Sequence, residues 1–257
     1  MLGAIAGDVI GSPYEWDRIK TTEFPLFGAE SHWTDDTVLT IAVADSLLGD
    51  RDYRAAIRSW GIRHPRAGYG GMFRHWLSLD ERQAVPYNSF GNGSAMRVSA
   101  VGWLLHSVDE VLDVAKRSAE VTHNHAEGIK GAQAVALAIF LARTGTSKDG
   151  IRRELTTRFG YDLDRRLEVI RLDYRFNETC QGSVPEALIA FFEADSWEAA
   201  VRNAVSLGGD ADTQACIAGA VAEAFFGGVP PDIGAEVKRR LTREMVDVLR
   251  RFEKARR

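Results

Sequence analysis

The chain has 257 residues, of which 45% are hydrophobic and 26% are charged, and its formal net charge is −4. A chain of this size can bury roughly three quarters of its unfolded surface, so we expect one domain over residues 1–257. The slightly negative charge argues against general nucleic-acid binding, and no apolar run reaches the length of a membrane span.

The chain opens with an apolar stretch, residues 2–11, that is predicted to form a helix. Gly3, Gly7 and Gly11 recur at every fourth position, so they form a flat stripe on which another backbone can approach closely. Asp8 interrupts the stretch and no basic residues precede it, which excludes a secretory signal peptide. We therefore expect a cytoplasmic protein, and we expect it to be a monomer. The glycine stripe predicts that its first helix packs closely against another helix.

The first acidic cluster, Thr34-Asp35-Asp36-Thr37, follows a polar and irregular stretch over residues 16–33 that we expect to be a loop. Residues 38–48, directly after the cluster, are apolar on nearly all sides, which predicts a buried helix. Asp and Thr are favoured at helix N-termini because their side-chain oxygens accept hydrogen bonds from unpaired N–H groups. Capping of this helix is therefore one explanation of the cluster.

A helix predicted over residues 51–60 is followed by two turn-rich loops, at residues 64–71 and 85–94. The second loop contains small residues and leads directly into a helix predicted over residues 95–106. Such a loop leaves backbone N–H groups accessible, which is the general form of a phosphate-binding loop at a helix N-terminus. An ordinary capped loop explains the same pattern, and Phe90 is either a stacking platform for a ligand or a core residue.

The middle of the chain is predicted to be helical. Ser107 with Glu110, and Ser183 with Glu186, have the spacing of a capping box at the start of a helix. Residues 129–143 between them are almost wholly apolar and predict a helix in the core.

Two histidines, His123 and His125, lie at a break in this helical region. Side chains two positions apart on a helix point in different directions, so we do not interpret the pair as a metal site. Considered alone, a histidine at a helix break is more often a hydrogen-bonded structural residue than a catalytic one. Residues 146–182, further along, contain no recognisable site motif.

The second acidic cluster is Gly208-Gly209-Asp210-Ala211-Asp212-Thr213, which precedes a predicted helix over residues 215–226. Two helices that each begin with two Asp and a Thr hold more carboxylates than capping requires. Like charges brought together raise one another's pKa unless a cation is present. Because hard oxygen ligands suit Mg²⁺ or Mn²⁺ rather than zinc, we predict a binuclear metal site where the two helix N-termini meet.

The patterns as a whole predict an all-α fold, with about ten helical segments, no sustained strand alternation and no internal repeat. In such a fold, sites lie at helix ends and in loops. Cys180 and Cys216 are far apart and lack C-x-x-C spacing, which favours reduced thiols, with a single disulfide as the alternative.

Six motifs then occur in a characteristic order and at characteristic separations. They are Gly7-Asp8-x-x-Gly11-x-x-x-Glu15, Thr34-Asp35-Asp36-Thr37, Gly68-Tyr69-Gly70, Gly91-Asn92-Gly93-Ser94-Ala95-Met96-Arg97, Thr122-His123 and Gly208-Gly209-Asp210-Ala211-Asp212-Thr213. This ordered set resembles the ADP-ribosylglycohydrolase family, which includes dinitrogenase reductase-activating glycohydrolase. The resemblance extends from residue 2 to about residue 228; each motif alone is weakly specific, but the ordered set is highly specific.

The resemblance implies an all-helical hydrolase with two Mg²⁺ or Mn²⁺ ions that releases ADP-ribose from a modified acceptor by cleaving the glycosidic bond at C1″. The metal ligands that it implies are Thr34, Asp35, Asp36, Asp210, Asp212 and Thr213. Glu15 becomes the flexible acid near the metals and is the expected catalytic residue together with Asp35 and Asp212. Ser89, Phe90, Gly91 and Asn92 would line the diphosphate and adenine, and Tyr69, Gly70 and His123 would lie along the ribose and phosphates.

Other interpretations use parts of the same pattern. A His-Asp phosphohydrolase requires a His followed by Asp, which the chain lacks, and a terpene synthase requires D-D-x-x-D, whereas residues 35–39 read Asp-Asp-Thr-Val-Leu. A non-catalytic relative of the family that only binds ADP-ribose or serves a structural role stays open, although all six expected ligands are present. The acceptor also stays open, whether arginine, serine, a nucleic-acid base or a free ADP-ribose derivative.

Overall fold

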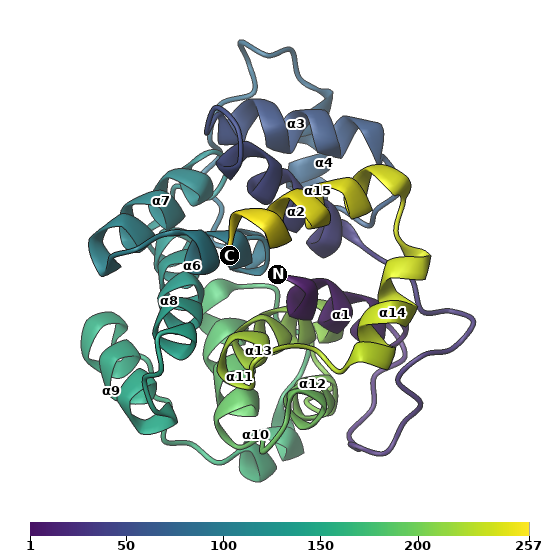
Figure 1. Ribbon diagram of the computed structural model, residues 1–257, viewed down its shortest axis with the longest axis vertical. Helices are drawn as coiled ribbons and strands as arrows, with labels where there is room; N and C mark the ends of the chain where they lie inside the picture. Colours follow the sequence, from purple (N-terminus) through teal and green to yellow (C-terminus); the bar gives the residue numbers. More distant parts are fainter. Residues whose placement is uncertain (257) are drawn as a thin grey trace.

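The computed structural model describes residues 1–256, and within them the chain forms fifteen α-helices joined by loops (Figure 1). The helices are α1 (Leu2–Gly11), α2 (Asp35–Leu47), α3 (Tyr53–Arg63), α4 (Gly71–Ser78), α5 (Gly93–Met96), α6 (Ser99–Leu104), α7 (Val108–Glu120), α8 (Ala126–Arg143), α9 (Lys148–Phe159), α10 (Leu167–Asp173), α11 (Cys180–Phe192), α12 (Trp197–Val205), α13 (Ala211–Phe225), α14 (Pro231–Arg240) and α15 (Arg243–Ala255), with a 3₁₀ turn, η1 (Ser12–Tyr14), after α1. The predicted all-α fold is confirmed, and the one β-type pairing in the described chain is an isolated antiparallel bridge between Gly91 and Thr179. Arg257, the last residue of the predicted domain, lies outside the described residues.

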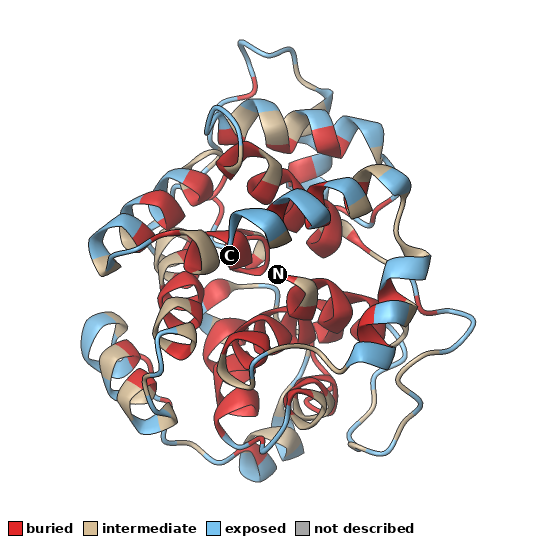
Figure 2. Ribbon diagram, in the orientation of Figure 1, coloured by how far each residue is buried: buried red, intermediate tan, exposed pale blue. Residues whose placement is uncertain are grey.

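The centre of the fold is α13, in which every residue from Ala211 to Ala224 is buried. Helices α1, α11 and α12 pack around it, and Figure 2 shows α1 and α13 as almost continuously buried ribbons. A helix that is buried on all sides needs small and apolar residues around its whole circumference, and α13 is rich in alanine. The polar residues at its N-terminus are therefore held inside the protein.

The glycine stripe of α1 is what brings α1 against α13. A Cβ atom on Gly7 would lie 2.0 Å from the carbonyl oxygen of Ala215, and one on Gly11 would lie 2.5 Å from that of Ala211. Both distances are far below van der Waals contact, so the two backbones touch at these positions. The expected close approach of a second helix is confirmed, and it places the end of α1 beside the start of α13.

Two predicted helices begin or break differently in the structure. The helix expected over residues 95–106 is divided into α5 and α6, because the carbonyl of Met96 accepts hydrogen bonds from Thr40 Oγ1 and Cys216 Sγ instead of continuing a helical ladder. The helix expected to begin at Ser183 begins at Cys180 instead. Its N-cap is Thr179, whose Oγ1 accepts from the N–H of Gly182 at 3.1 Å.

Several other helices begin at a serine N-cap. Ser107 caps the following helix through its side-chain oxygen, as its position predicted, and Ser147 and Ser196 cap their helices in the same way. Cys180 and Cys216 are free and buried, so the expectation of reduced thiols is confirmed. Among the helices of residues 1–256, none has both the length and the apolar character needed to cross a membrane.

Candidate metal and substrate site

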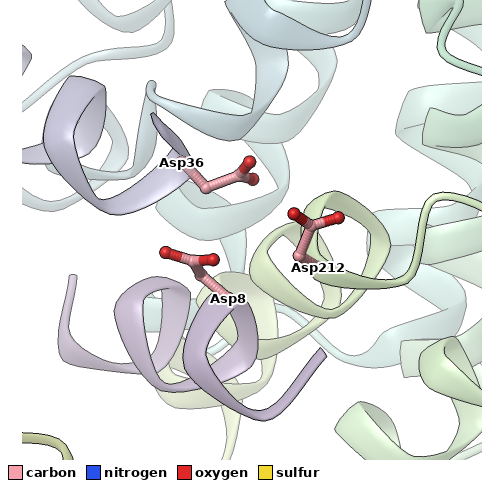
Figure 3. A group of neighbouring side chains, drawn as sticks. All are labelled: Asp8, Asp36 and Asp212. Atoms are coloured by element: carbon pink, nitrogen blue, oxygen red, sulfur yellow. The ribbon is translucent and has the colours of Figure 1, made fainter. Parts of the chain in front are cut away.

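An acidic cluster forms where the end of α1, the turn η1 and the N-termini of α2 and α13 meet. Figure 3 shows three of its members, Asp8 on α1, Asp36 on α2 and Asp212 on α13, with their carboxylates directed toward one another. Oxygen atoms of these three residues lie within 4.8 Å of one another, and so do those of Glu15, Asp210 and Asp212. Asp212 belongs to both groups, so the cluster has two adjacent positions for a cation that share one carboxylate.

The electrostatics of the cluster are unfavourable without a cation. Burial raises the pKa of Asp8 and of Glu15 to about 7 each, and the neighbouring Asp212 carboxylate adds to both shifts. Burial and Asp212 also raise the pKa of Asp36 and Asp210 well above the usual range. A group of carboxylates in this state must take up either protons or a cation.

Asp8 joins α1 to the start of α2. Its carboxylate accepts hydrogen bonds from the N–H of Thr34 (3.0 Å), Thr34 Oγ1 (2.7 Å), the N–H of Thr37 (3.1 Å) and Thr37 Oγ1. Three of these four donors share Oδ2, so this carboxylate is largely occupied by the protein itself. Asp8, for which the sequence alone indicated no role, therefore orients the first acidic cluster.

The remaining oxygens of the cluster fit Mg²⁺ or Mn²⁺. Asp36 Oδ2 accepts from Thr213 Oγ1 at 3.1 Å, but Asp36 Oδ1 is buried and has no hydrogen-bond partner among residues 1–256. Thr34 Oγ1 donates its proton to Asp8 and accepts from the N–H of Asp36 at 3.4 Å, which leaves one lone pair free on the oxygen. An unpaired buried carboxylate oxygen amid hard oxygen donors is the chemistry that these ions require.

Asp35 and Tyr69 lie near one another and near the acidic cluster. Asp35 is half-buried and belongs to neither group of three, and its Oδ1 would lie 3.5 Å from a Cβ on Gly68. Tyr69 is buried with an unpaired hydroxyl, and its pKa is raised by burial and by the negative charge of Asp35. Gly70 is exposed, and a Cβ on it would meet nothing within 4 Å.

A second half of the site is made of loops, and its first segment is residues 88–93. The N–H of Gly91 donates to Ser89 Oγ at 3.1 Å, and Ser89 itself is buried. Phe90 points away from the core and is 44% exposed, with its ring edge-on to that of His125 at 5.4 Å. Of the two roles considered for Phe90, this exposure favours the stacking platform.

Asn92 joins the loop half to the acidic cluster. Its side chain is buried, and Nδ2 donates to Asp210 Oδ2 at 2.7 Å and to Ser183 Oγ at 3.2 Å. Asp210 is the N-cap residue of α13 but makes no side-chain capping bond, so its carboxylate is directed to Asn92 and the cluster instead. The simple capping explanation does not hold for this residue.

The two histidines have separate roles. His125 caps α8, because its Nδ1 accepts from the N–H of Glu127 at 3.1 Å. His123 is buried beneath the 88–93 loop, where a Cβ on Gly93 would lie 3.2 Å from its Nε2. Burial, and next the positive charge of Arg97, hold the pKa of His123 well below its usual range, so the ring is neutral.

The segment over residues 174–180 is a part of the site that no sequence motif marks. The N–H of Asn92 donates to the carbonyl of Glu178 (2.8 Å), and the N–H of Cys180 donates to that of Phe90 (2.9 Å). Tyr174 accepts a hydrogen bond from Gln214 Nε2 on α13 at 3.0 Å. This segment therefore supports the 88–93 loop and α13 at once, although it contains no motif by which it could have been found.

The same segment also contacts the residues around Glu15. The ring of Phe176 stacks with that of Trp16 at a centroid distance of 5.8 Å, and the Arg18 guanidinium lies 5.0 Å from its centre. Glu15 is half-buried at the end of η1, directly before these exposed residues. Its carboxylate thus lies at the boundary between the buried cluster and solvent.

Comparisons with known proteins agree with this arrangement. A sequence model of the ADP-ribosylglycohydrolase family matches residues 1–257. The chain is 27% identical to ADP-ribosylhydrolase ARH3 of Mus musculus, over 88% of this chain and 82% of that protein. It is 26% identical to the ADP-ribosylarginine hydrolase Tri1 of Pseudomonas putida (strain GB-1), over 90% of this chain and 71% of that protein.

A solved structure described as an ADP-ribosylglycohydrolase-related protein complex superposes on the chain with a TM-score of 0.72. The superposition covers 100% of this chain and 97% of that one, at 24% sequence identity. It shows that the arrangement of helices is shared along the whole length.

Proposed function

Because the chain belongs to the ADP-ribosylglycohydrolase family, we propose that it is a metal-dependent hydrolase that releases ADP-ribose from a modified acceptor by cleaving the bond at C1″. The observation that carries the proposal is the position of Asp212, whose carboxylate belongs to two adjacent groups of three acidic residues. One shared carboxylate between two cation positions is suited to a pair of ions, either Mg²⁺ or Mn²⁺. The proposed ligands are Thr34, Asp35, Asp36, Asp210, Asp212 and Thr213.

The ions, when bound, supply Lewis acidity and a positive charge that offsets the carboxylates and attracts an anionic diphosphate. Asp8 contributes by holding Thr34 and Thr37, so that the N-terminus of α2 keeps its orientation toward α13. Thr213 contributes by donating to Asp36, which fixes that carboxylate across the gap between α2 and α13.

Glycosidic cleavage passes through an oxocarbenium-like state and needs a group that moves a proton. We assign this role to Glu15, which transfers a proton to the leaving acceptor or takes one from the attacking water. Its carboxylate lies beside Asp210 and Asp212 but at the edge of the cluster, where an acceptor can approach from solvent. Asp35 and Asp212 would act with it as ligands that hold the ions.

The substrate itself would lie along the loop half. The adenine stacks on the exposed ring of Phe90, and Ser89, Gly91 and Asn92 line the diphosphate. Tyr69 and Gly70, near Asp35, and His123, beneath the 88–93 loop, would lie along the ribose and phosphates. The support for this assignment is the hydrogen bond from Asn92 to Asp210, which connects the loop to the acidic cluster.

The experiment that tests the proposal is a panel of ADP-ribosylated substrates, including arginine- and serine-linked forms, assayed with Mg²⁺ and with Mn²⁺. Release of free ADP-ribose from at least one member, dependent on a divalent ion, is the expected result. A protein that binds ADP-ribose and metal but releases nothing from any substrate would instead be a binding module.

A further inference from the structure

Among residues 1–256, Arg97 is a fully buried cation that has no carboxylate partner. Its exposed fraction is 0%, and its hydrogen bonds run from Nη2 to the carbonyls of Ser118 (2.8 Å) and Ala119 (3.5 Å) and to Thr122 Oγ1 (3.1 Å). The two carbonyls end α7, whose partial negative charge is the main compensation for the guanidinium. Burial lowers the pKa of Arg97 to about 10, which leaves it protonated at neutral pH.

Such an arrangement is costly, because Nε and Nη1 of Arg97 are buried with no hydrogen-bond partner in residues 1–256. A buried charge of this kind is most readily explained by what it does to its neighbours. Thr122 connects Arg97 to His123, because its Oγ1 accepts from Arg97 and lies 2.7 Å from Nδ1 of His123.

The direction of the hydrogen bonds from Arg97 through Thr122 to His123 follows from the donors available. A guanidinium can only donate, so Thr122 Oγ1 accepts from Arg97 and keeps its own proton to give. Among residues 1–256, the other hydrogen-bond partner of Thr122 Oγ1 is Nδ1 of His123, which can accept that proton. The proton of Thr122 is therefore directed to Nδ1 of His123.

A neutral histidine that accepts at Nδ1 carries its proton on Nε2. Nε2 faces the loop expected to hold the diphosphate, since a Cβ on Gly91 or Gly93 would lie 3.5 or 3.2 Å from it. The absence of side chains at both glycines keeps this nitrogen close to the loop backbone. A protonated Nε2 at this place is a hydrogen-bond donor for an anion.

We propose that Arg97 and Thr122 are positioning residues that fix the neutral His123 ring with its proton on Nε2, as a donor to the diphosphate of ADP-ribose. The hydrogen bond from His123 to the diphosphate rests on the proposed function. The tautomer of His123 is a property of the protein without ligand. Neither Arg97 nor Thr122 touches the substrate in this arrangement.

The test compares Thr122→Val, which removes the hydroxyl, with Thr122→Ser, which keeps it. The ¹⁵N NMR spectrum of histidine-labelled full-length protein, with the His123 signals assigned by their loss in His123→Gln, reports which ring nitrogen is protonated. We expect a proton on Nε2 in the parent and in Thr122→Ser, and a mixed or reversed tautomer in Thr122→Val. Titration with ADP-ribose should then show about 10- to 100-fold weaker binding for Thr122→Val alone, the range for losing one hydrogen bond to a charged group.

Arg97→Lys, which keeps a charged donor, should retain more of the parent tautomer than Arg97→Met. If Arg97→Met does not fold, the comparison of Thr122→Val with Thr122→Ser still tests the positioning role, because both variants keep Arg97. A parent with its proton on Nδ1, or a Thr122→Val variant with the parent tautomer, overturns the positioning role. A parent with the expected tautomer that fails to bind ADP-ribose overturns the diphosphate as recipient and, with it, the proposed function, while the NMR result on Arg97 and Thr122 stands.

Discussion

The two halves of the site are built by different means. The acidic half consists of side chains on α1, α2, α13 and the end of η1; the backbones of α1 and α13 touch, and the residues of the three helices are nearly all buried. The loop half consists of residues 88–93, 122–125 and 174–180, which hold one another through main-chain hydrogen bonds. The difference shows that closely spaced like charges require a rigid core to oppose their repulsion, whereas an extended ligand can be bound by loops.

The largest effect is expected from Asp212→Asn, which removes the carboxylate shared by both proposed cation positions. Mg²⁺ or Mn²⁺ should raise the melting temperature of the parent protein, because an ion that binds only the folded state stabilises it. This gain should nearly vanish in the variant, and turnover should fall beyond the range of about 10²–10⁴-fold that the loss of one acid–base group causes. Calorimetric titration with the metal and thermal unfolding are the measurements.

Asp17→Asn is the matched control, since Asp17 is an exposed carboxylate close to Glu15 in the chain. It should bind metal and unfold like the parent. A parent protein that binds no divalent ion in calorimetry contradicts the assignment of the acidic half.

The next largest effect is expected from Glu15→Gln, which tests the member of the acidic half that lies at the solvent boundary. Glutamine keeps the size and much of the hydrogen bonding but cannot exchange a proton, so turnover should fall by about 10²–10⁴-fold. Metal content and ADP-ribose affinity should stay near those of the parent, because a proton-transferring group matters chiefly in the transition state. Single-turnover release and titration on one preparation separate the two effects.

Two other outcomes would reassign Glu15. Undiminished turnover removes it from the mechanism. Weakened metal binding makes it a ligand, in keeping with its position beside Asp210 and Asp212.

A third prediction concerns the core that carries the acidic half. In Gly7→Ala the new methyl group would lie 2.0 Å from the carbonyl oxygen of Ala215, so α1 and α13 must separate. We expect the free energy of unfolding to fall by about 3 kcal/mol, at the upper end of the usual cost of overpacking. Metal binding should weaken as well, because Asp8 moves with α1. Denaturant unfolding measures the first effect and calorimetry the second.

Gly28→Ala is the control for this substitution. A Cβ on Gly28 meets nothing within 4 Å, so stability should hardly change. Equal stability of the two variants would show that the backbones of α1 and α13 are not in contact.

The smallest effect is expected in the loop half, from Phe90→Ala. Loss of an aromatic–base stack should weaken ADP-ribose binding by about 1–3 kcal/mol and leave metal binding unchanged. The control is Val85→Ala, an exposed apolar residue shortly before this loop segment. An unchanged dissociation constant for Phe90→Ala would mean that the ring packs against His125 without contributing to the ligand.

Much of the acidic half could be predicted from the sequence because its signals are local. Two pairs of aspartates beside threonines, each opening a helix, exceed what capping needs, and the spacing of Gly3, Gly7 and Gly11 indicates a close helix contact. The role of Asp8 could not be predicted from a local signal of this kind. Its partners Thr34 and Thr37 lie on another helix, and only the packing of α1 on α2 brings them within reach.

The loop half was predictable only where a motif marked it. Residues 88–93 carry small residues before a helix, but the segment over residues 174–180 acts through its carbonyl and N–H groups, which every residue possesses. The break between α5 and α6 likewise depends on Thr40 and Cys216, which lie far from Met96 in the chain. Interactions of this kind are determined by tertiary packing and leave no pattern in the local sequence.

The pairing of α1 with α13 also has a consequence for how the protein is made. Asp8, Asp35 and Asp36 leave the ribosome early, whereas Asp210 and Asp212 are added about two hundred residues later, after ten or more seconds at ordinary rates of synthesis. Until then α1 lacks the helix that covers its glycine stripe, and the early carboxylates have no second set of ligands with which to share a cation. Binding of the proposed ions would thus be a late event that depends on contacts of high sequence separation, which form slowly. The bound ions would therefore distinguish completed chains from truncated ones.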